Sequence, residues 1–307
     1  MQPIKRPLPR AAIAALILLL SAAAVSAQDR LRIYTVNYPL AYFAERIAGD
    51  LAEVTFPAPG DVDPAFWMPD AETITAYQAA DLILLSGADY EKWTGKVSLP
   101  RSRLVDTSRA FRDAYIREAG GITHSHGPGG EHDHGGLAFT TWLDLSQAAQ
   151  QAEAIAQALI RKSPDAKEEI ERNLHALRDD LLALDERIAE ITRTDPGRPL
   201  LASHPVYQYL ARRYGLNLIS VMWEPEELPN EGQWNALEGI LEDHPARWML
   251  WEGEPGQATA TRLRALGIDS LVLDPCANRP AKGDFLTVMT DNASNLDRII
   301  GHESGAR

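Results

Sequence analysis

PDAKEEIERNLHALRDDLLALDERIAEIT, residues 164–192, is the stretch that decides the architecture of this chain. Its apolar residues recur at alternating spacings of four and three, which places them on one face of a helix: Ile170, Leu174, Leu177, Leu181, Leu184, Ile188 and Ile191. At a rise of 1.5 Å per residue, such a helix is roughly 43 Å long, too long for one small domain to cover. We predict a connecting helix, residues 163–194, between two lobes; a coiled-coil dimer is the alternative.

Short β-rich runs alternate with helical stretches on both sides of this helix. The expected strands are residues 31–36, 82–85, 104–106, 200–203, 218–222, 248–251 and 270–273. The expected helices are residues 39–49, 144–160, 206–214, 232–243, 257–266 and 285–300. Such alternation predicts parallel sheets built from βα units. The expected fold class is therefore α/β, with two parallel-sheet lobes, residues 28–162 and 195–307, joined by one long rigid helix.

The first 27 residues have the pattern of a secretory signal peptide. Basic residues precede an apolar run, residues 11–25, and Val25-Ser26-Ala27 has the small-x-small form of a cleavage site. A transmembrane anchor is the alternative, but a span needs about 20 apolar residues. No Cys near the cleavage point could accept a lipid. We therefore expect a freely diffusing periplasmic protein with no membrane insertion of the mature chain.

Charge and cysteine content narrow the classes of partner. The net charge is −13, and loss of the leader removes Lys5, Arg6 and Arg10 and no acidic residue, which makes it −16. Nucleic acid and anionic membrane surfaces would repel such a chain, whereas a negative field suits a cation. The lone Cys276 excludes an internal disulfide, so stability must come from the core.

A glycine-rich stretch, residues 120–136, interrupts the first lobe and contains half of the eight histidines. It can hold no packed core, so we expect a mobile surface loop. Its histidines are His124, His126, His132 and His134. Neutral imidazole is a common ligand of zinc, nickel and copper, and a flexible segment of this kind would capture or relay an ion. A solvated polar loop without a ligand is the plainer interpretation.

Three further candidates follow expected strands of the second lobe. His204 follows the strand 200–203, Glu252 follows 248–251, and Asp274 follows 270–273. Ligand sites in α/β proteins form at such strand ends. The alternatives are ordinary: His204 could begin a helix, and Asp274 could cap the turn at Pro275. Cys276 could be a soft ligand, although a lone Cys is more often buried and inert.

Enzyme signatures are missing from the sequence. It contains no His-Glu-x-x-His, no Gly-x-Ser-x-Gly, no phosphate loop and no Cys pair. We therefore expect a binding protein and not an enzyme. A zinc hydrolase with Glu252 as its base is the competing hypothesis.

The chain resembles the substrate-binding proteins of bacterial zinc and manganese ABC importers over essentially its whole mature length. The marks are Tyr38-Pro39-Leu40 with Ile47-Ala48-Gly49-Asp50, Asp63-Pro64 with Pro69, Ala80-Asp81-Leu82 leading to Ser86-Gly87-Ala88, the His-rich loop followed by Trp142-Leu143-Asp144, Asn173, Leu184-Asp185, His204 with Tyr209 and Tyr214-Gly215-Leu216, Asp274-Pro275, and Met289-x-x-Asn292. Each mark is weak alone, but their order and spacing together are strong.

This resemblance implies one metal in a cleft between the lobes, with four ligands. These are a His after Asp-Pro, a His two residues before Trp-Leu-Asp, a His or Glu after the first strand of the second lobe, and an Asp near the end. The third falls on His204 and the fourth on Asp274, but the first two fall on Ala65 and Thr140. Zinc normally takes four ligands, so the usual site is half missing.

The missing donors leave three hypotheses. The loop could fold back and complete the site, because the six steps from His134 to Thr140 span roughly 20 Å when extended. The protein could instead bind weakly or bind a metal held by a small chelator, or the metal role could be lost. We expect a monomeric receptor that captures a divalent ion, zinc before manganese, copper or nickel, for an inner-membrane ABC permease. A periplasmic metal buffer or chaperone is the alternative.

Overall fold

The computed structural model describes residues 30–117, 123–125, 131–133 and 136–300. In the first lobe, one sheet has the strand order β2-β1-β3-β4, with all neighbours parallel. The strands are β1 (Leu31–Thr35), β2 (Ala52–Thr55), β3 (Leu82–Leu85) and β4 (Leu104–Asp106). β1 is central: its Ile33 is in register with Val54 on one side and Leu82 on the other. Helices α2 (Tyr38–Ala48) and α3 (Ala71–Ala79) connect these strands.

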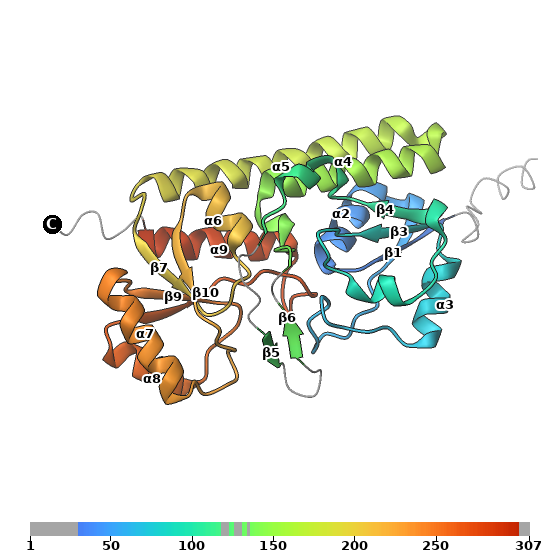
Figure 1. Ribbon diagram of the computed structural model, residues 1–307. Helices are drawn as coiled ribbons and strands as arrows, with labels where there is room; N and C mark the ends of the chain where they lie inside the picture. Colours follow the sequence, from blue (N-terminus) through green and yellow to red (C-terminus); the bar gives the residue numbers. More distant parts are fainter. Residues whose placement is uncertain (1–29, 118–122, 126–130, 134–135, 301–307) are drawn as a thin grey trace, which may run out of the picture.

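The second lobe repeats the plan with the order β10-β9-β7-β8, again with parallel neighbours. Its strands are β7 (Pro199–Ala202), β8 (Asn217–Ser220), β9 (Trp248–Trp251) and β10 (Asp269–Val272). Helices α6 (Gln208–Tyr214), α7 (Glu231–Asp243) and α8 (Gln257–Ala265) connect them. Two parallel sheets with crossover helices confirm the α/β fold class expected from the alternating pattern, and Figure 1 shows the two lobes side by side.

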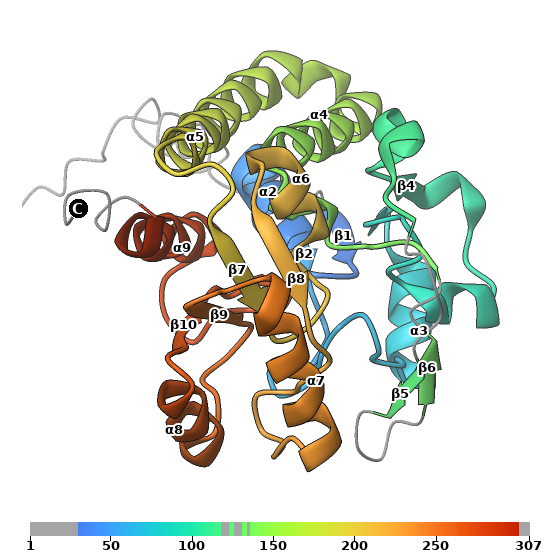
Figure 2. The same ribbon diagram turned by 60° about the vertical axis from the view of Figure 1, so that its left-hand side comes forward.

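Helix α5 (Lys167–Arg193) runs across both lobes beside α4 (Leu145–Lys162), as Figures 1 and 2 show. The seven apolar residues of its stripe are between 0 and 8% exposed. They pack within this chain, because α5 contacts α4, α2 and α9 (Phe285–Ile300). The stripe is therefore covered without a partner chain, and a coiled-coil dimer would lack the apolar surface that it needs.

Polar contacts fasten α5 to each lobe. On the first lobe, Asn173 Nδ2 donates to the carbonyl of Ile47 at 3.1 Å. On the second lobe, the buried carboxylate of Asp185 accepts from Arg213 and from the hydroxyl of Tyr214. The helix is thus anchored at both ends of its length, as a rigid connection requires.

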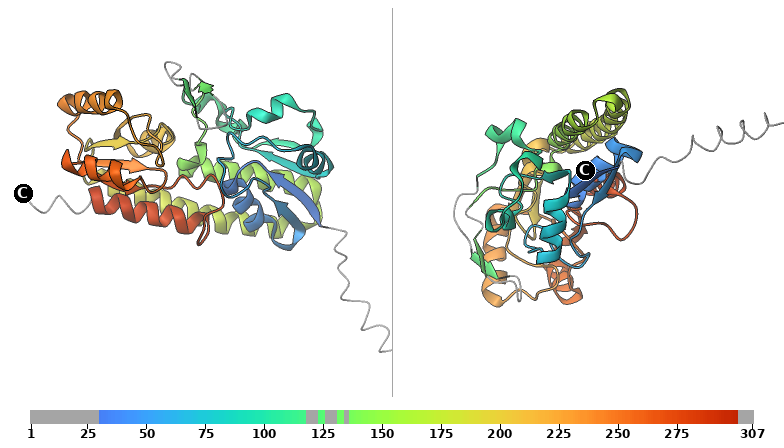
Figure 3. Two further views of the ribbon diagram at one scale, coloured as in Figure 1. Left: turned by 90° about the horizontal axis from the view of Figure 1, so that it is seen from below. Right: turned by 90° about the vertical axis from the view of Figure 1, so that its right-hand side faces the viewer.

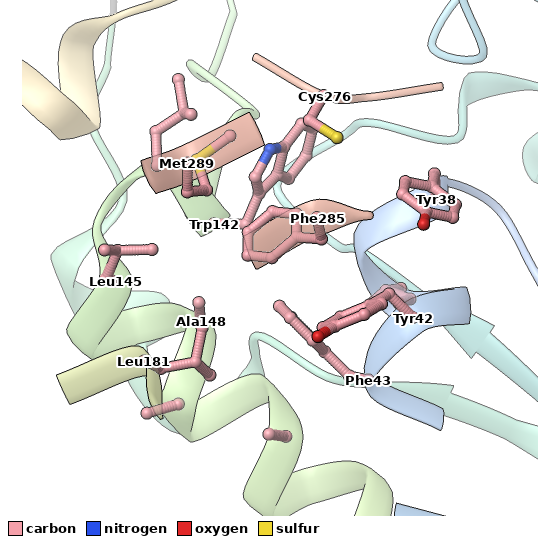
Figure 4. Packing of buried hydrophobic residues seen from close by; sticks show 14 of the residues in the cluster. Tyr38, Tyr42, Phe43, Trp142, Leu145, Ala148, Leu181, Cys276, Phe285 and Met289 are labelled. Atoms are coloured by element: carbon pink, nitrogen blue, oxygen red, sulfur yellow. The ribbon is translucent and has the colours of Figure 1, made fainter. Parts of the chain in front are cut away.

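One continuous core runs through both lobes. Figure 4 shows part of it, where Trp142, Phe285 and Cys276 meet the aromatic rings of α2. Trp142 Nε1 donates to the carbonyl of Pro275 at 2.8 Å, which ties the entry of α4 to the segment after β10. A second, smaller core around Trp223, Trp234 and Trp251 lies within the second lobe. Because the larger core is shared, the lobes are packed together as one body.

Some elements of the structure differ from the sequence-based expectations. β2 and α3 were not predicted: β2 is mixed in polarity, and Tyr77 is the buried residue of α3. Part of the expected surface loop forms an antiparallel hairpin of β5 (Thr123–Ser125) and β6 (Glu131–Asp133).

Within the described ranges, no helix is both long and apolar enough to span a bilayer. The predicted signal peptide, residues 1–27, lies outside the described residues.

Candidate metal cleft

His204 stands just beyond the carboxyl end of β7 and is 5% exposed. Its Nδ1 lies 3.0 Å from Oε1 of Glu224, which comes from the segment after β8. A carboxylate on one ring nitrogen fixes the orientation of the imidazole, and metal-binding histidines commonly have such a partner. The imidazole of His204 is therefore oriented in the way that is common for metal-binding histidines.

Glu252 and Asp274 follow β9 and β10, at the same edge of the sheet as His204. Asp274 is fixed by its neighbours: its Oδ1 accepts from the Cys276 amide at 2.7 Å, and its backbone amide donates to Asn292 at 3.1 Å. Cys276 has a positive φ of 57°, and its thiol is buried. Burial raises the pKa of that thiol, so it stays protonated and is a poor metal ligand, as the inert interpretation expects.

Asp63 is the contribution of the first lobe. Its Oδ1 accepts from the Ala65 amide at 2.9 Å, and its charge acts on both His204 and Glu252. Asn278 links this turn to the segment after Asp274, because its Nδ2 donates to the carbonyls of Pro59 and Val62 at 2.6 and 2.8 Å. Acidic groups of both lobes therefore surround one imidazole.

The electrostatics of this cluster favour a cation. The pKa of Glu252 is raised to about 7, and burial is the largest cause. His204 lowers this pKa in part, whereas Asp63, Glu224 and Asp274 raise it further. Burial alone would lower the pKa of His204, but Glu224, Glu252 and Asp63 outweigh it, and the pKa lies above its usual value. Burial also raises the pKa of Asp274. Buried carboxylates whose pKa values are raised in this way would gain from a shared divalent cation.

Ala65 and Thr140 occupy the positions where the resemblance expects imidazoles. The hydroxyl of Thr140 donates to the carbonyl of Val206, so this residue does lie beside the His204 segment. Ala65 is 4% exposed and has no donor atom to offer. Aromatic rings fill this side: Phe139 packs edge-on against Phe66 and Tyr90, with ring centroids 6.2 and 5.5 Å away. The first lobe thus supplies a carboxylate and aromatic surface instead of two imidazoles.

The described side chains do not yet form a complete coordination shell. Among them, no three His, Cys, Asp or Glu groups are arranged closely enough to hold a metal ion. His204, Glu252 and Asp274 share one sheet edge and are coupled electrostatically, but a bound ion needs them to close in or needs further donors.

The His-rich hairpin carries further histidines of the chain. His124 on β5 is directly opposite His132 on β6 in the backbone register. His126 and His134 lie outside the described residues. The hairpin lies between the lobes on the side away from α5, which Figures 1 and 3 show. An antiparallel bridge between Arg117 and Leu137 closes its base.

Glu224 and Asp63 are the members of this cluster that sequence reasoning did not identify. Glu224 lies four residues beyond β8, so the strand-end argument that found Glu252 could also have found it. Asp63 was noted only as part of an Asp-Pro pair. Its place in the cleft depends on contacts between the lobes, which no local pattern shows.

Comparisons with known proteins agree with this architecture. The family model described as zinc-uptake complex component A, periplasmic, matches residues 33–299. The zinc-binding lipoprotein AdcA of Streptococcus pneumoniae strain TIGR4 is 26% identical over 96% of this chain, which spans 61% of that protein. The high-affinity zinc uptake system protein ZnuA of Bacillus subtilis is 25% identical, covering 73% of this chain and 71% of that protein.

A solved structure shows the same fold. The Zn(II)-bound ZnuA-like domain of Streptococcus pneumoniae AdcA superposes with a TM-score of 0.74 at 22% identity, covering 88% of this chain and 99% of that domain. The match of the family model to most of the chain decides the classification. The chain belongs to the family of periplasmic zinc-uptake components, whose members include substrate-binding proteins of zinc and manganese ABC transporters and are not enzymes.

Proposed function

We propose that this protein captures a divalent transition metal, zinc first, in the periplasm and delivers it to an inner-membrane ABC permease. The observation that carries this proposal is the buried imidazole of His204, which Glu224 orients and on which the charges of Glu252 and Asp63 act. The described function of the relatives supports zinc: AdcA is called zinc-binding and ZnuA a zinc uptake protein. We also propose the division into a leader (1–27), lobes (28–162 and 195–307) and a connecting helix (163–194).

The proposed ligands come from two places. His204, Glu252 and Asp274 are the donors in the cleft, and His124, His126, His132 and His134 of the hairpin supply the nitrogen donors that Ala65 and Thr140 lack. Zinc in proteins usually has four ligands from nitrogen, sulfur and oxygen, which this mixed set can provide. A single fixed imidazole among carboxylates also suits manganese better than a site of three imidazoles would, so Mn²⁺, Cu²⁺ and Ni²⁺ remain competitors in the test.

The test is metal content and affinity of the purified mature protein. His204→Ala and Asp274→Ala should each weaken binding of the tightest ion by more than about tenfold, because each removes a direct donor. His175→Ala is the matched control, since this exposed histidine lies on α5. Unchanged affinity in both cleft variants would rule out the proposed site.

A receptor for a chelated metal is the second candidate. It is favoured by the aromatic surface of Phe66 and Phe139, both partly buried, beside the small Ala65. An organic chelator could pack there and supply the donors that the cleft lacks. Titrations with zinc alone and with zinc bound to a small aromatic chelator distinguish the two candidates, because only a chelate receptor would bind the complex more tightly than the free ion.

A further inference from the structure

We propose that Tyr209 is the positioning residue that fixes the stem of the His-bearing hairpin to the second lobe. The stem is defined as residues 114–117 and 137–140, the two segments that lead into and out of the hairpin. Tyr209 lies at the start of α6, five residues after His204, and is 0% exposed. The inference rests on the proposed function, because it concerns how the hairpin's imidazoles are held relative to the cleft.

One phenol hydroxyl contacts both strands of the stem. Tyr209 Oη accepts from the amide of Ile116 at 3.2 Å and donates to the carbonyl of Ala138 at 3.0 Å. The two strands also bond each other, with the Ala138 amide donating to the carbonyl of Ile116 at 3.0 Å. The hydroxyl thus acts as donor to one strand of the stem and as acceptor from the other, which joins both strands to α6.

Neighbouring contacts hold the stem at both ends. Arg212, one turn along α6, stacks over the ring of Tyr209 at 5.0 Å and donates to the carbonyl of Ala114. At the other end, Thr140 donates to the carbonyl of Val206. Val206, Tyr209 and Arg212 therefore all form hydrogen bonds with the stem. Because these residues follow His204 closely in the chain, the position of the stem depends on that of the His204 segment.

The stem also borders open space on the side of the first lobe. A cavity of about 1030 Å³ lies there, and its lining includes Arg117 and Leu137, the bridged pair at the base of the hairpin. On this side Tyr115 reaches the first lobe through a hydrogen bond between its hydroxyl and Ser108 Oγ. Because the first lobe leaves such a space beside the stem, loss of the Tyr209 hydroxyl should free the stem to shift into it.

The first experiment measures amide hydrogen exchange in the metal-free protein. Tyr209→Phe keeps the ring and its contact with Arg212 but removes both hydrogen bonds. We expect exchange in the stem to accelerate by about tenfold or more. Tyr214→Phe is the matched control, because it lies on the same helix and loses a buried hydroxyl that binds Asp185 instead of the stem. Equal stem exchange in the two variants would overturn the proposal.

The second experiment measures the rate of zinc transfer from a coloured chelator. Tyr209→Phe should slow transfer several-fold in the natural hairpin and have no effect when His124, His126, His132 and His134 are all replaced by Ala. Equal slowing in both backgrounds would mean that Tyr209 acts through general stability, and would overturn the positioning role. If the natural protein takes up no zinc, the proposed function fails, while the exchange experiment still decides the role of Tyr209.

Discussion

The imidazole of His204 and the carboxylate of Glu224 lie 3.0 Å apart, Nδ1 to Oε1, although they follow different strands of the second sheet. The pair is well protected from solvent, with side-chain exposures of 6 and 27%. A partner of this kind sets the ring orientation and strengthens the imidazole as a donor. In a cleft that has one fixed imidazole, this pair should govern metal affinity.

Glu224→Gln should therefore weaken metal binding by about tenfold or more without unfolding the protein. Glutamine keeps the shape and one acceptor oxygen, but it lacks the charge that raises the pKa of His204. Isothermal titration with zinc measures the effect. Glu226→Gln, an exposed change in the same loop, is the control and should keep full affinity. An affinity equal to that of the control would show that Glu224 has no influence on the site.

The protein should be a monomer in solution, because the apolar stripe of α5 is covered by α4, α2 and α9 of the same chain. Light scattering on the mature protein measures this directly. Leu177 is 0% exposed, so Leu177→Asp should cost about 3 kcal/mol or more of unfolding free energy by burying a charge. A stable dimer that Leu177→Asp converts into a folded monomer would support the coiled-coil alternative.

Glu91 should make stability depend on pH. Burial raises its pKa to about 8, against the opposing effect of hydrogen bonds from the amides of Gly87 and Ser86. The folded state therefore keeps a proton that the unfolded chain gives up near pH 4.5. Stability from this residue is fully present below that pH, and it is lost progressively as pH rises to about 8, by at most about 5 kcal/mol.

Urea unfolding between pH 5 and 9 tests this prediction. Glu91→Gln removes the ionisable group, so the variant should lose less stability than the natural protein as pH rises. Glu53→Gln, a change at an exposed residue of β2, should leave the pH profile as it was. A profile of Glu91→Gln that matches the natural one would show that Glu91 is not protonated in the folded state.

Periodic patterns predicted most of the fold, and strand ends predicted part of the site. The stripe on α5 and the expected strands of both lobes are confirmed because burial imposes a period that sequence retains. β2 and α3 lack such a period, since β2 is short and of mixed burial and α3 buries only Tyr77. Asp63 was missed for another reason: its neighbours in the cleft come from a segment about 140 residues or more away in the chain, and only the packing of the lobes brings them together.

The structure limits the reach of the hairpin histidines toward the cleft more tightly than the sequence alone does. Ala138 and Thr140 are both held by the second lobe, so the extended reach of roughly 20 Å cannot be counted from Thr140. Counted from Leu137, the three steps back to His134 span about 10 Å when extended. The hairpin imidazoles therefore reach the cleft only if the stem already holds them near it.

Removal of residues 124–134 should then abolish tight zinc binding, since the described cleft side chains do not form a metal shell by themselves. Alanine at all four hairpin histidines is the matched variant: it keeps the chain length and should have the same effect if imidazole is what the hairpin contributes. Equilibrium dialysis with zinc gives affinity and stoichiometry for each. A deletion that lowers stoichiometry but keeps one tight site would identify the hairpin as a separate capture site. Full one-to-one affinity after deletion would contradict any role of the hairpin and would direct attention to Asp63 and Glu224 as the remaining donors.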